Sequence, residues 1–298
     1  MNQADSPYLI AIMGPTGSGK TFLAERMAKE LNAQLINADA FHIYKGFDIG
    51  TNKPHNKEVY KLLDIKEPHE PFSAGEWINE TLPILQELWD QKKHAIIVGG
   101  TGFYIRALFE EWRDLEPAPP KEVRDKILNQ EKQFGLKTLY DQLQELDPFT
   151  AKEIDPQNPI RVRRALEKAL APQPKITFQL PGFQKTKIGI LLPIDILNTL
   201  IDQRTEHLLE TGWIEETRHL KEQGITKDLP AMRAIGYQTV FELIENQILY
   251  PEALFKIQIE TKQYAKKQRT WLRSEPHLKK LFIKDLEELE QISLTSIL

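Results

Sequence analysis

The sequence predicts an α/β fold, in which a parallel sheet core carries helices on both faces and a helical domain is inserted into the chain. Three short apolar segments, residues 9–13, 34–38 and 95–98, are typical of buried parallel strands. Apolar residues recur at helical spacing over residues 73–92, where Pro83 is expected to bend or delimit the helix. A doubly wound sheet binds its ligands at the carboxyl ends of its strands, so we expect the chemistry directly after these strands.

The first predicted strand leads into a glycine-rich loop. This loop fits the pattern G-x-x-x-x-G-K-[ST] and consists of Gly14, Pro15, Thr16, Gly17, Ser18, Gly19, Lys20 and Thr21. Its glycines let successive backbone N–H groups point at one anion, and the helix expected to follow adds a partial positive charge. Lys20 supplies a full charge, and the hydroxyl of Thr21 is a ligand for Mg²⁺. The loop predicts a P-loop NTPase-like core that binds phosphates, including those of ATP. Whether a phosphoryl group is transferred stays open.

The second and third predicted strands end in segments of different chemistry. Asp39 follows residues 34–38 and could act as a metal ligand, a general base or a turn residue that caps a helix. Residues 99–104 place Thr101 among glycines, where its hydroxyl either hydrogen-bonds a ligand or caps the next helix. The acidic Mg²⁺ ligand that kinases usually need is missing after residues 95–98. These strand ends predict a phosphate site without deciding its reaction.

The composition changes after Leu115. The sequence EPAPP follows and predicts a stiff connector, and residues 121–170 then show a helical and highly charged pattern. After several prolines, residues 188–192 are typical of another buried strand, which would rejoin the sheet. We therefore expect residues 1–115 and 188–298 to form the core, with a mainly helical C-terminal part, and residues 116–187 to form the helical insertion.

Two basic stretches are typical of a nucleic-acid surface, although a solvated helix face has the same composition. One lies in the insertion and contains Arg161, Arg163, Arg164 and Lys168. The other contains Lys262, Lys266, Lys267, Arg269 and Arg273, with Tyr264 and Trp271 among them. Positions 262, 266, 269 and 273 recur at helical spacing, so we expect them to share one face. Interleaved arginine and aromatic residues would suit phosphate contacts and base stacking.

The bulk composition limits the class of protein. The chain has 298 residues, a net charge of −4 and no cysteine, which excludes disulfides, zinc–thiolate sites and thiol catalysis. The charge does not attract nucleic acid to the molecule as a whole, so any such contact would be local. Neither a signal peptide nor a membrane-spanning apolar stretch is expected, and we predict a cytoplasmic, monomeric protein.

Six motifs carry a resemblance to a known family. They are GPTGSGKT at 14–21, IYKGFDIGTNKP at 43–54, VGGTGFY at 98–104, RVRRALE at 161–167, MRAIGYQ at 232–238 and QYAKKQRTWLR at 263–273. The first is shared by many NTPases, but the combination resembles the tRNA dimethylallyltransferase (tRNA isopentenyltransferase) family over nearly the whole chain. The resemblance implies transfer of a dimethylallyl group from dimethylallyl diphosphate to N6 of the adenosine 3′ of the anticodon, with Mg²⁺ as cofactor and diphosphate as leaving group.

The resemblance also implies residue roles. Asp39 would be the general base, Thr101 would hydrogen-bond the bridging oxygen of the diphosphate, and Arg233 would neutralise the departing charge together with Lys20. The insertion would grip the anticodon stem-loop, and the target base would flip out of its stack. The residues implied to contact tRNA are Asp39, Ala40, Phe41, His42, Thr101, Arg124, Ile160, Arg161, Val162, Arg163, Arg164, Lys266, Lys267 and Arg269.

The sequence departs from the family in two places. The usual D-S-x-Q segment reads DAFH at residues 39–42, so that Ala40 lacks a hydroxyl and His42 replaces an amide. Leu200 stands at an often basic position, while Arg204 is kept. Three alternatives stay open: a prenyltransferase acting on free adenine nucleotides, a small-molecule kinase, and an RNA-binding module without activity. The basic stretches argue against the first and the missing acid after residue 98 against the second.

Overall fold

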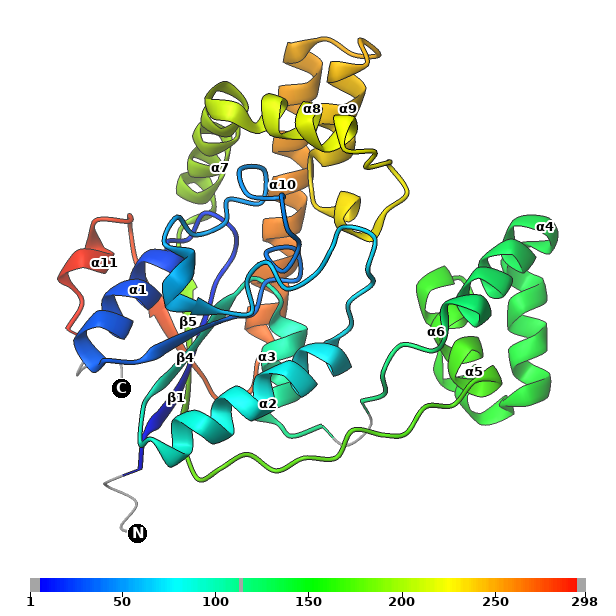
Figure 1. Ribbon diagram of the computed structural model, residues 1–298, viewed down its shortest axis with the longest axis horizontal. Coiled ribbons are helices and arrows are strands. Elements are labelled where there is room, and N and C mark those ends of the chain that lie inside the picture. The colour runs from blue at the N-terminus through cyan, green and yellow to red at the C-terminus, as the bar shows by residue number, and fades with distance from the viewer. Residues whose placement is uncertain (1–5, 113–114, 294–298) are drawn as a thin grey trace. The chain divides into compact units, whose positions relative to one another are not determined.

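The computed structural model describes residues 6–112 and 115–293. It divides into two compact units (Figure 1). The larger unit contains the chain up to Phe72, the segment Trp77–Glu111 and the chain from Gln179 onward. The smaller unit contains Ser73–Glu76 and the segment between Trp112 and Phe178. Residues 179–187, which the sequence analysis assigned to the insertion, therefore belong to the larger unit.

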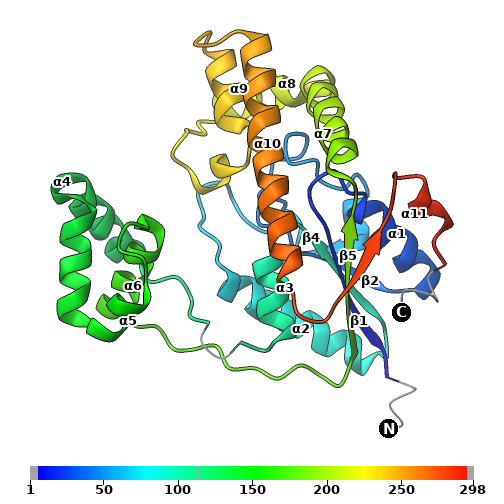
Figure 2. The same ribbon diagram turned by 180° about the vertical axis from the view of Figure 1, so that it is seen from behind.

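Within the described residues, one six-stranded sheet forms the centre of the larger unit (Figures 1 and 2). Its strand order is β3-β2-β4-β1-β5-β6, and every neighbouring pair is parallel. The strands are β1 (Tyr8–Met13), β2 (Gln34–Asn37), β3 (Tyr60–Lys61), β4 (Ala95–Gly99), β5 (Gln184–Leu191) and β6 (Leu278–Phe282). Strands β1, β2 and β4 confirm the three predicted strands, and the predicted α/β class is confirmed with them.

The other strands differ from the prediction. Strand β5 begins at Gln184, four residues earlier than expected, because Gln184 pairs with Tyr8 at the start of β1. Strand β3 has only two residues, too few for a periodic pattern. Strand β6 has the sequence LKKLF at the edge of the sheet, where lysines replace the continuous apolar run of a buried strand. The C-terminal part is mainly helical, as predicted, but β6 is a strand that the sequence did not predict.

Helices cover both faces of the sheet. Ile10 and Ile12 of β1 pack with Leu23 and Met27 of α1 in one apolar cluster. Their neighbour Leu9 points to the opposite face and is equally buried, because successive strand residues alternate between faces. The larger unit contains α1 (Lys20–Leu31), α3 (Gly102–Phe109), α7 (Ile194–Leu208), α8 (Ile214–Glu222), α9 (Tyr237–Ile244), α10 (Tyr250–Arg273) and α11 (Glu288–Gln291), with short turns of other helix types at Lys57–Val59, Leu209–Trp213 and Pro230–Arg233.

Helix α2 (Ala74–Asp90) lies between β3 and β4 in the chain. Pro83 lies inside this helix and does not delimit it. A second apolar cluster of the larger unit surrounds Trp213 and Tyr237 and includes Phe47, so the long loop after β2 packs against α8, α9 and α10. Among the described residues, no helix combines the length and apolar character needed to cross a membrane.

The smaller unit is helical, as the sequence predicted for this segment. It contains α4 (Lys121–Leu146), α5 (Pro148–Glu153) and α6 (Pro159–Leu170). Gly135 interrupts the helical geometry of α4 with φ 82°. Asp147 and Asn158 cap α5 and α6 by accepting hydrogen bonds from backbone N–H groups. The core of this unit contains Leu143, Val162 and Leu166 among other apolar side chains.

Candidate active site

A cavity of about 550 Å³ opens in the larger unit at the carboxyl ends of the central strands. The phosphate-binding loop after β1, Asp39 after β2 and Gly99 of β4 all line it. Helices α7 and α10 contribute Arg204, Tyr264 and Gln268. The site therefore forms where a doubly wound sheet places its ligands, from segments far apart in the sequence.

The phosphate-binding loop has the backbone geometry that anion binding requires. Gly17 and Gly19 have φ values of 84° and 77°, in the left-handed region that favours glycine. The ammonium of Lys20 lies 3.4 Å from the carbonyl oxygen of Pro15. Burial lowers the pKa of Lys20 to about 8, although the charge of Asp39 acts in the opposite direction. Because burial disfavours the charged form of Lys20, an anionic ligand would stabilise that form.

Arg204 is a second cation at the phosphate-binding loop. It donates a 2.6 Å hydrogen bond to the Thr16 hydroxyl, and burial lowers its pKa to about 10. Its Nε has no hydrogen-bond partner among the described residues. Buried, incompletely paired cations are costly unless a ligand compensates them, so Arg204 extends the anion site beyond the loop itself. Arg204 is not among the site residues that the sequence predicted.

Asp39 is held in one orientation at the end of β2. Its Oδ1 accepts a 3.0 Å hydrogen bond from the Phe41 N–H, and its own N–H donates to the side-chain oxygen of Asn37 at 3.0 Å. Burial would raise the pKa of the Asp39 carboxyl, but the nearby His42, the Phe41 N–H and Lys20 outweigh burial and hold it below the usual value. The carboxylate is thus ionised at neutral pH, as a general base must be. The turn that the sequence allowed is present, and the Oδ2 atom of Asp39 lies close to Gly100.

Thr101 occupies the N-cap position of α3, but its side chain makes no capping hydrogen bond. Instead, its hydroxyl oxygen accepts a 3.0 Å hydrogen bond from the Ala40 N–H. Its backbone N–H donates to the carbonyl oxygen of Ala38 at 3.1 Å. Because the hydroxyl oxygen already accepts a bond, its proton is directed to another acceptor. Of the two interpretations that the sequence left open, side-chain capping of α3 is not observed, and ligand binding by the hydroxyl stays a prediction.

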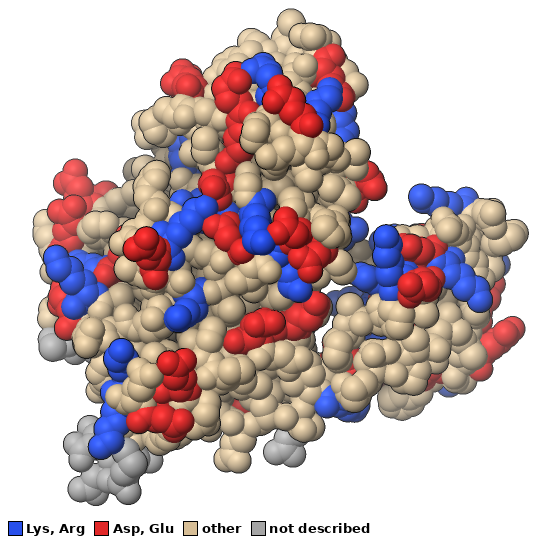
Figure 3. Space-filling view, in the orientation of Figure 1, with Lys and Arg blue, Asp and Glu red and all other residues tan. Residues whose placement is uncertain are grey.

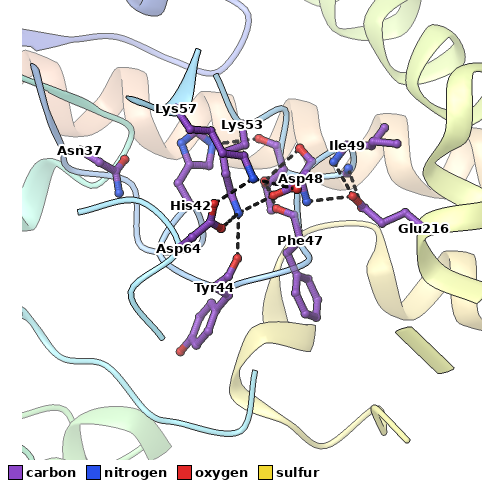
Figure 4. Close-up of polar contacts among 12 residues, drawn as sticks. Asn37, His42, Tyr44, Phe47, Asp48, Ile49, Lys53, Lys57, Asp64 and Glu216 are labelled. Atoms are coloured by element: carbon purple, nitrogen blue, oxygen red, sulfur yellow. Dashed lines mark hydrogen bonds and ion pairs between the residues drawn. The ribbon is translucent and has the colours of Figure 1, made fainter. Parts of the chain in front are cut away.

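The loop after β2 lines the cavity through residues such as His42 and Gly50, and polar contacts hold it in place (Figure 4). The fully buried side chain of Lys53 donates to the carbonyl oxygen of Tyr44 at 2.8 Å and to carboxylates of Asp48 at 2.6 Å and Asp64 at 2.5 Å. Lys57 bridges the other oxygens of the same two carboxylates. A buried ammonium with three oxygen partners fixes its loop, because any opening leaves charges unpaired.

A carboxylate on α8 holds the same loop from the other side (Figure 4). Glu216 accepts hydrogen bonds from the N–H groups of Asp48 at 2.8 Å, Ile49 at 2.7 Å and Gly50 at 3.2 Å. It also accepts a 2.6 Å bond from the hydroxyl of Tyr237. Gly50 packs so closely on Trp213 that an added Cβ would lie 2.0 Å from the indole nitrogen. Backbone N–H groups of the GFDIG part of the sequence motif therefore bind the Glu216 carboxylate.

His42 lies on this loop and lines the cavity. Its Nε2 lies 3.0 Å from the carbonyl oxygen of Thr51. Burial lowers the pKa of the His42 imidazole despite the nearby Asp39 charge, so the ring is neutral at pH 7. Phe41 also lines the cavity, whereas Ala40 contributes its backbone N–H to Thr101. The altered DAFH segment is thus fully built into the site.

Arg233 lies at the end of a short helical turn and lines the cavity with an exposed side chain. The predicted catalytic residues Asp39, Thr101 and Arg233 thus all belong to the larger unit. Thr101 is not itself a cavity-lining residue, but its hydrogen bond to the Ala40 N–H ties it to the segment that is.

The basic stretch on α10 divides between several roles. Lys266 and Lys267 are exposed, in agreement with a surface role. Lys262 instead pairs with Asp202 at 2.6 Å, and Arg269 donates to the carbonyl oxygen of Leu192. The aromatic residues of this stretch do not line a common basic face. Tyr264 lines the cavity, and Trp271 stacks under the guanidinium of Arg106 at 4.0 Å.

The smaller unit presents some of the predicted tRNA-binding residues to solvent. Ile160 is 71% exposed and Arg161 is also exposed. Arg163 pairs with Glu131 at 3.1 Å, and Arg164 donates to the carbonyl oxygens of the connector at residues 116 and 117. Acidic and basic side chains lie next to one another on the face in Figure 3. Arg124 is half-buried on α4.

Val162 is fully buried in the core of the smaller unit. Its side chain supports α6 and does not reach the surface, although the sequence analysis placed it among the tRNA-binding residues.

Fold and site together define a P-loop-type protein with a departure from the NTP-hydrolysing members. Strand β4 ends in Gly99, and within the described residues no three His, Asp or Glu side chains cluster as a metal site. The carboxylate near the phosphate-binding loop is Asp39, which follows the neighbouring strand β2. This arrangement suits a group-transfer enzyme that binds a phosphorylated donor and removes a proton from an acceptor.

Comparisons with known proteins agree with this class. A family model described as IPP transferase matches residues 42–275, and one described as isopentenyl transferase matches residues 7–75. The chain is 35% identical over 274 residues to the tRNA dimethylallyltransferase of Thermomicrobium roseum, covering 89% of this chain and 83% of that one. It is 35% identical over 282 residues to the enzyme of Francisella tularensis subsp. novicida, covering 90% and 91%. The chain therefore belongs to the IPP transferase family, and the resemblance seen in the sequence is confirmed.

Solved structures show the same relationship. A tRNA isopentenylpyrophosphate transferase from Bacillus halodurans superposes with a TM-score of 0.69 at 29% identity, covering 96% of this chain and 94% of that one. A eukaryotic dimethylallyltransferase acting on tRNA superposes with a TM-score of 0.79 at 23% identity, covering 98% of this chain and 77% of that one. At that identity the second likeness shows the fold alone.

Proposed function

We propose that this protein transfers a dimethylallyl group from dimethylallyl diphosphate to N6 of the adenosine 3′ of the anticodon in tRNA. One observation carries the proposal beyond family membership. The phosphate-binding loop and the ionised carboxylate of Asp39 face the same cavity. Thr101 is joined to the Asp39 segment through the Ala40 N–H. Phosphate binding and proton removal are therefore combined at one place without the acid that kinases use.

The chemistry follows from these groups. The N6 nitrogen attacks C1 of the dimethylallyl group, and the C1–O bond to diphosphate breaks with its electron pair passing to that oxygen. Asp39 accepts the proton that N6 loses as the N–C bond forms, because the nitrogen lone pair is otherwise conjugated into the ring. Thr101 donates a hydrogen bond from its hydroxyl to the bridging oxygen, and Lys20, Arg204 and Arg233 offset the charge that develops on the diphosphate.

The residues present also fit a Mg²⁺ ion at the phosphate-binding loop. The hydroxyl of Thr21 lies at the cavity, and the fully buried hydroxyl of Ser18 has no hydrogen-bond partner among the described residues. Mg²⁺ is commonly bound by one or two protein groups together with substrate phosphates and water, so a larger carboxylate cluster is not required. When bound, Mg²⁺ would supply charge neutralisation to the diphosphate. Thr21 would hold the ion, with Ser18 nearby.

For tRNA, we propose that the helical insertion and α10 supply the contacts. Exposed side chains at Ile160, Arg161, Lys266 and Lys267 support this proposal. Phosphate contacts by such residues would make binding fall with salt. We further propose that the protein acts as a monomer in the cytoplasm, which size-exclusion chromatography and cell fractionation would test.

The deciding experiment combines the protein with Mg²⁺, labelled dimethylallyl diphosphate and tRNA that lacks the modification. Label should enter the tRNA with the wild type and at least about a hundredfold more slowly with Asp39→Asn, which keeps the shape of the side chain but cannot accept the proton. Equal labelling of free AMP would favour the adenine-nucleotide alternative. Turnover of ATP with a small acceptor would favour a kinase. If the wild type binds tRNA but incorporates no label into it, the proposal is contradicted.

A further inference from the structure

Gln268 of α10 connects the two halves of the site. Its side-chain oxygen accepts a 2.8 Å hydrogen bond from the N–H of Thr16 in the phosphate-binding loop. Its side-chain nitrogen donates a 3.0 Å hydrogen bond to the carbonyl oxygen of Gly100, next to Thr101. One amide thus spans the loop that follows β1 and the loop that follows β4. Gln268 is only 7% exposed.

The bond to Gly100 fixes a peptide unit that matters for the chemistry. The carbonyl of the Gly100–Thr101 peptide is held by Gln268, and the N–H of the same peptide is held by the carbonyl of Ala38. This peptide leads directly to the Thr101 hydroxyl. Hydrogen bonds at both its carbonyl and its N–H restrict rotation of this peptide, and the Ala40 N–H holds the Thr101 hydroxyl oxygen separately.

Glycine at position 100 leaves the space that this connection needs. A Cβ added there would lie 2.5 Å from Nε2 of Gln268 and 3.1 Å from Oδ2 of Asp39. The amide of Gln268 and the carboxylate of Asp39 therefore both lie close to the position that a side chain at residue 100 would occupy. Tyr264, one turn earlier on α10, lines the cavity beside them.

We propose that Gln268 is a positioning residue that sets the distance between the diphosphate cradle and the Asp39–Thr101 segment. It acts through the two loops and not on the reacting atoms. In the proposed transfer, the bond that breaks belongs to the donor held by one loop, and the bond that forms involves the acceptor nitrogen near the other. Because misplacement by about 1 Å can cost about a hundredfold in rate, an amide that ties the loops together would contribute mainly to kcat. This inference rests on the proposed function.

The test compares Gln268→Leu with Gln258→Leu. Gln258 is a matched control, since it lies on the same helix, is half-buried and donates to the carbonyl oxygen of Asp202 at 3.4 Å, outside the cavity. Gln268→Leu should lower the single-turnover rate of transfer by about tenfold to a hundredfold, with a change in KM for dimethylallyl diphosphate below about threefold. The effect of Thr101→Val should shrink in the Gln268→Leu background, because both changes act on one segment. Full additivity, or a loss confined to KM, would overturn the inference.

Gln268→Glu provides a second variant of similar shape, in which an ionisable oxygen replaces the donor to the Gly100 carbonyl. The carboxylate still accepts from the Thr16 N–H but cannot donate to the Gly100 carbonyl until it is protonated. Its rate relative to the wild type at the same pH should therefore recover as the pH falls from about 8 to about 6, because burial raises the pKa of a carboxyl. A pH-independent ratio would count against the positioning role.

Hydrogen–deuterium exchange separates this inference from the proposed function. Peptides covering residues 14–21 and 97–104 should exchange faster in Gln268→Leu and at wild-type rates in Gln258→Leu, whether or not the wild type is active. Unchanged exchange in both peptides would overturn the positioning role. If the wild type is active but exchange in Gln268→Leu is unchanged, the proposed function stands and the positioning role fails. If the wild type is inactive but exchange in Gln268→Leu is faster, only the proposed function is refuted.

Discussion

Glu216 offers the sharpest test of how the cavity wall is held. In the substitution Glu216→Gln, one carboxylate oxygen becomes an NH₂ group. The wild-type carboxylate accepts four hydrogen bonds, three from the backbone of residues 48–50 and one from the hydroxyl of Tyr237. An amide has only one accepting oxygen, so at least one backbone N–H must then face another donor. The tyrosine hydroxyl can turn to accept instead.

The cost can be worked out from these bonds. An unsatisfied, partly buried N–H costs about 1–3 kcal/mol, and hydrogen bonds to a charged acceptor are about twice as strong as neutral ones. With the weakest bond lost, that of the Gly50 N–H at 3.2 Å, and the charge removed from those that remain, we expect Glu216→Gln to lower the free energy of unfolding by about 3 kcal/mol. Because the loop lines the cavity, transfer should also fall.

Urea unfolding followed by circular dichroism measures this change. With an m value of about 3 kcal/mol/M, the midpoint should move down by about 1 M. Glu215→Gln is the matched control, because Glu215 is the preceding residue, its side chain is 72% exposed and it pairs with the exposed Arg218 one turn away. That variant should change stability by less than about 0.5 kcal/mol. If the two variants unfold at the same urea concentration, the carboxylate does not hold the loop and the reasoning is refuted.

Three further outcomes are expected. Asp39→Asn should reduce transfer by a factor of about 10² to 10⁴ while calorimetry shows unchanged binding of dimethylallyl diphosphate; comparable turnover would place the base elsewhere. The pKa of Lys20 is about 8, so the side chain is charged below that pH and must take up a proton to bind the ligand above it; affinity for dimethylallyl diphosphate should fall as pH rises beyond about 8, and a calorimetric series should show this slope flattened in Lys20→Met. Arg161→Ala with Arg164→Ala should weaken tRNA binding and reduce its salt dependence in gel-shift titrations without affecting the diphosphate, whereas the exposed Arg218→Ala should do neither.

The sequence predicted those parts of the site that depend on local geometry. The phosphate-binding loop needs glycines at positions 17 and 19 and a lysine at the helix start, and all of these are consecutive. Strands β1 and β4 have the continuous apolar runs of buried parallel strands and β2 has a shorter one, so these strands and the α/β class could be predicted. Asp39 was found because it directly follows one of these strands. Its role as base came from the family resemblance, since spacing alone left three interpretations.

Contacts across long sequence separations could not be predicted in the same way. Glu216 is 168 residues from Asp48, and Gln268 is 252 residues from Thr16. Both residues are charged or polar and lie on helices, where such side chains are usually expected to face solvent. Nothing in the local pattern indicates that they meet backbone donors there. Strand β6 was missed for a related reason, because an edge strand with exposed lysines lacks the apolar run.

The amino-acid sequence by itself determined the phosphate-binding loop, the central strands and the family. These depend on neighbouring residues, whose spacing fixes backbone geometry and burial directly. The tertiary structure alone decided which distant groups complete the site, namely Arg204 at Thr16, Gln268 between two loops, and Glu216 behind the cavity wall. Each of these contacts exists only because folding brings α7, α8 and α10 over the carboxyl ends of the strands, and burial there makes every unpaired polar group costly.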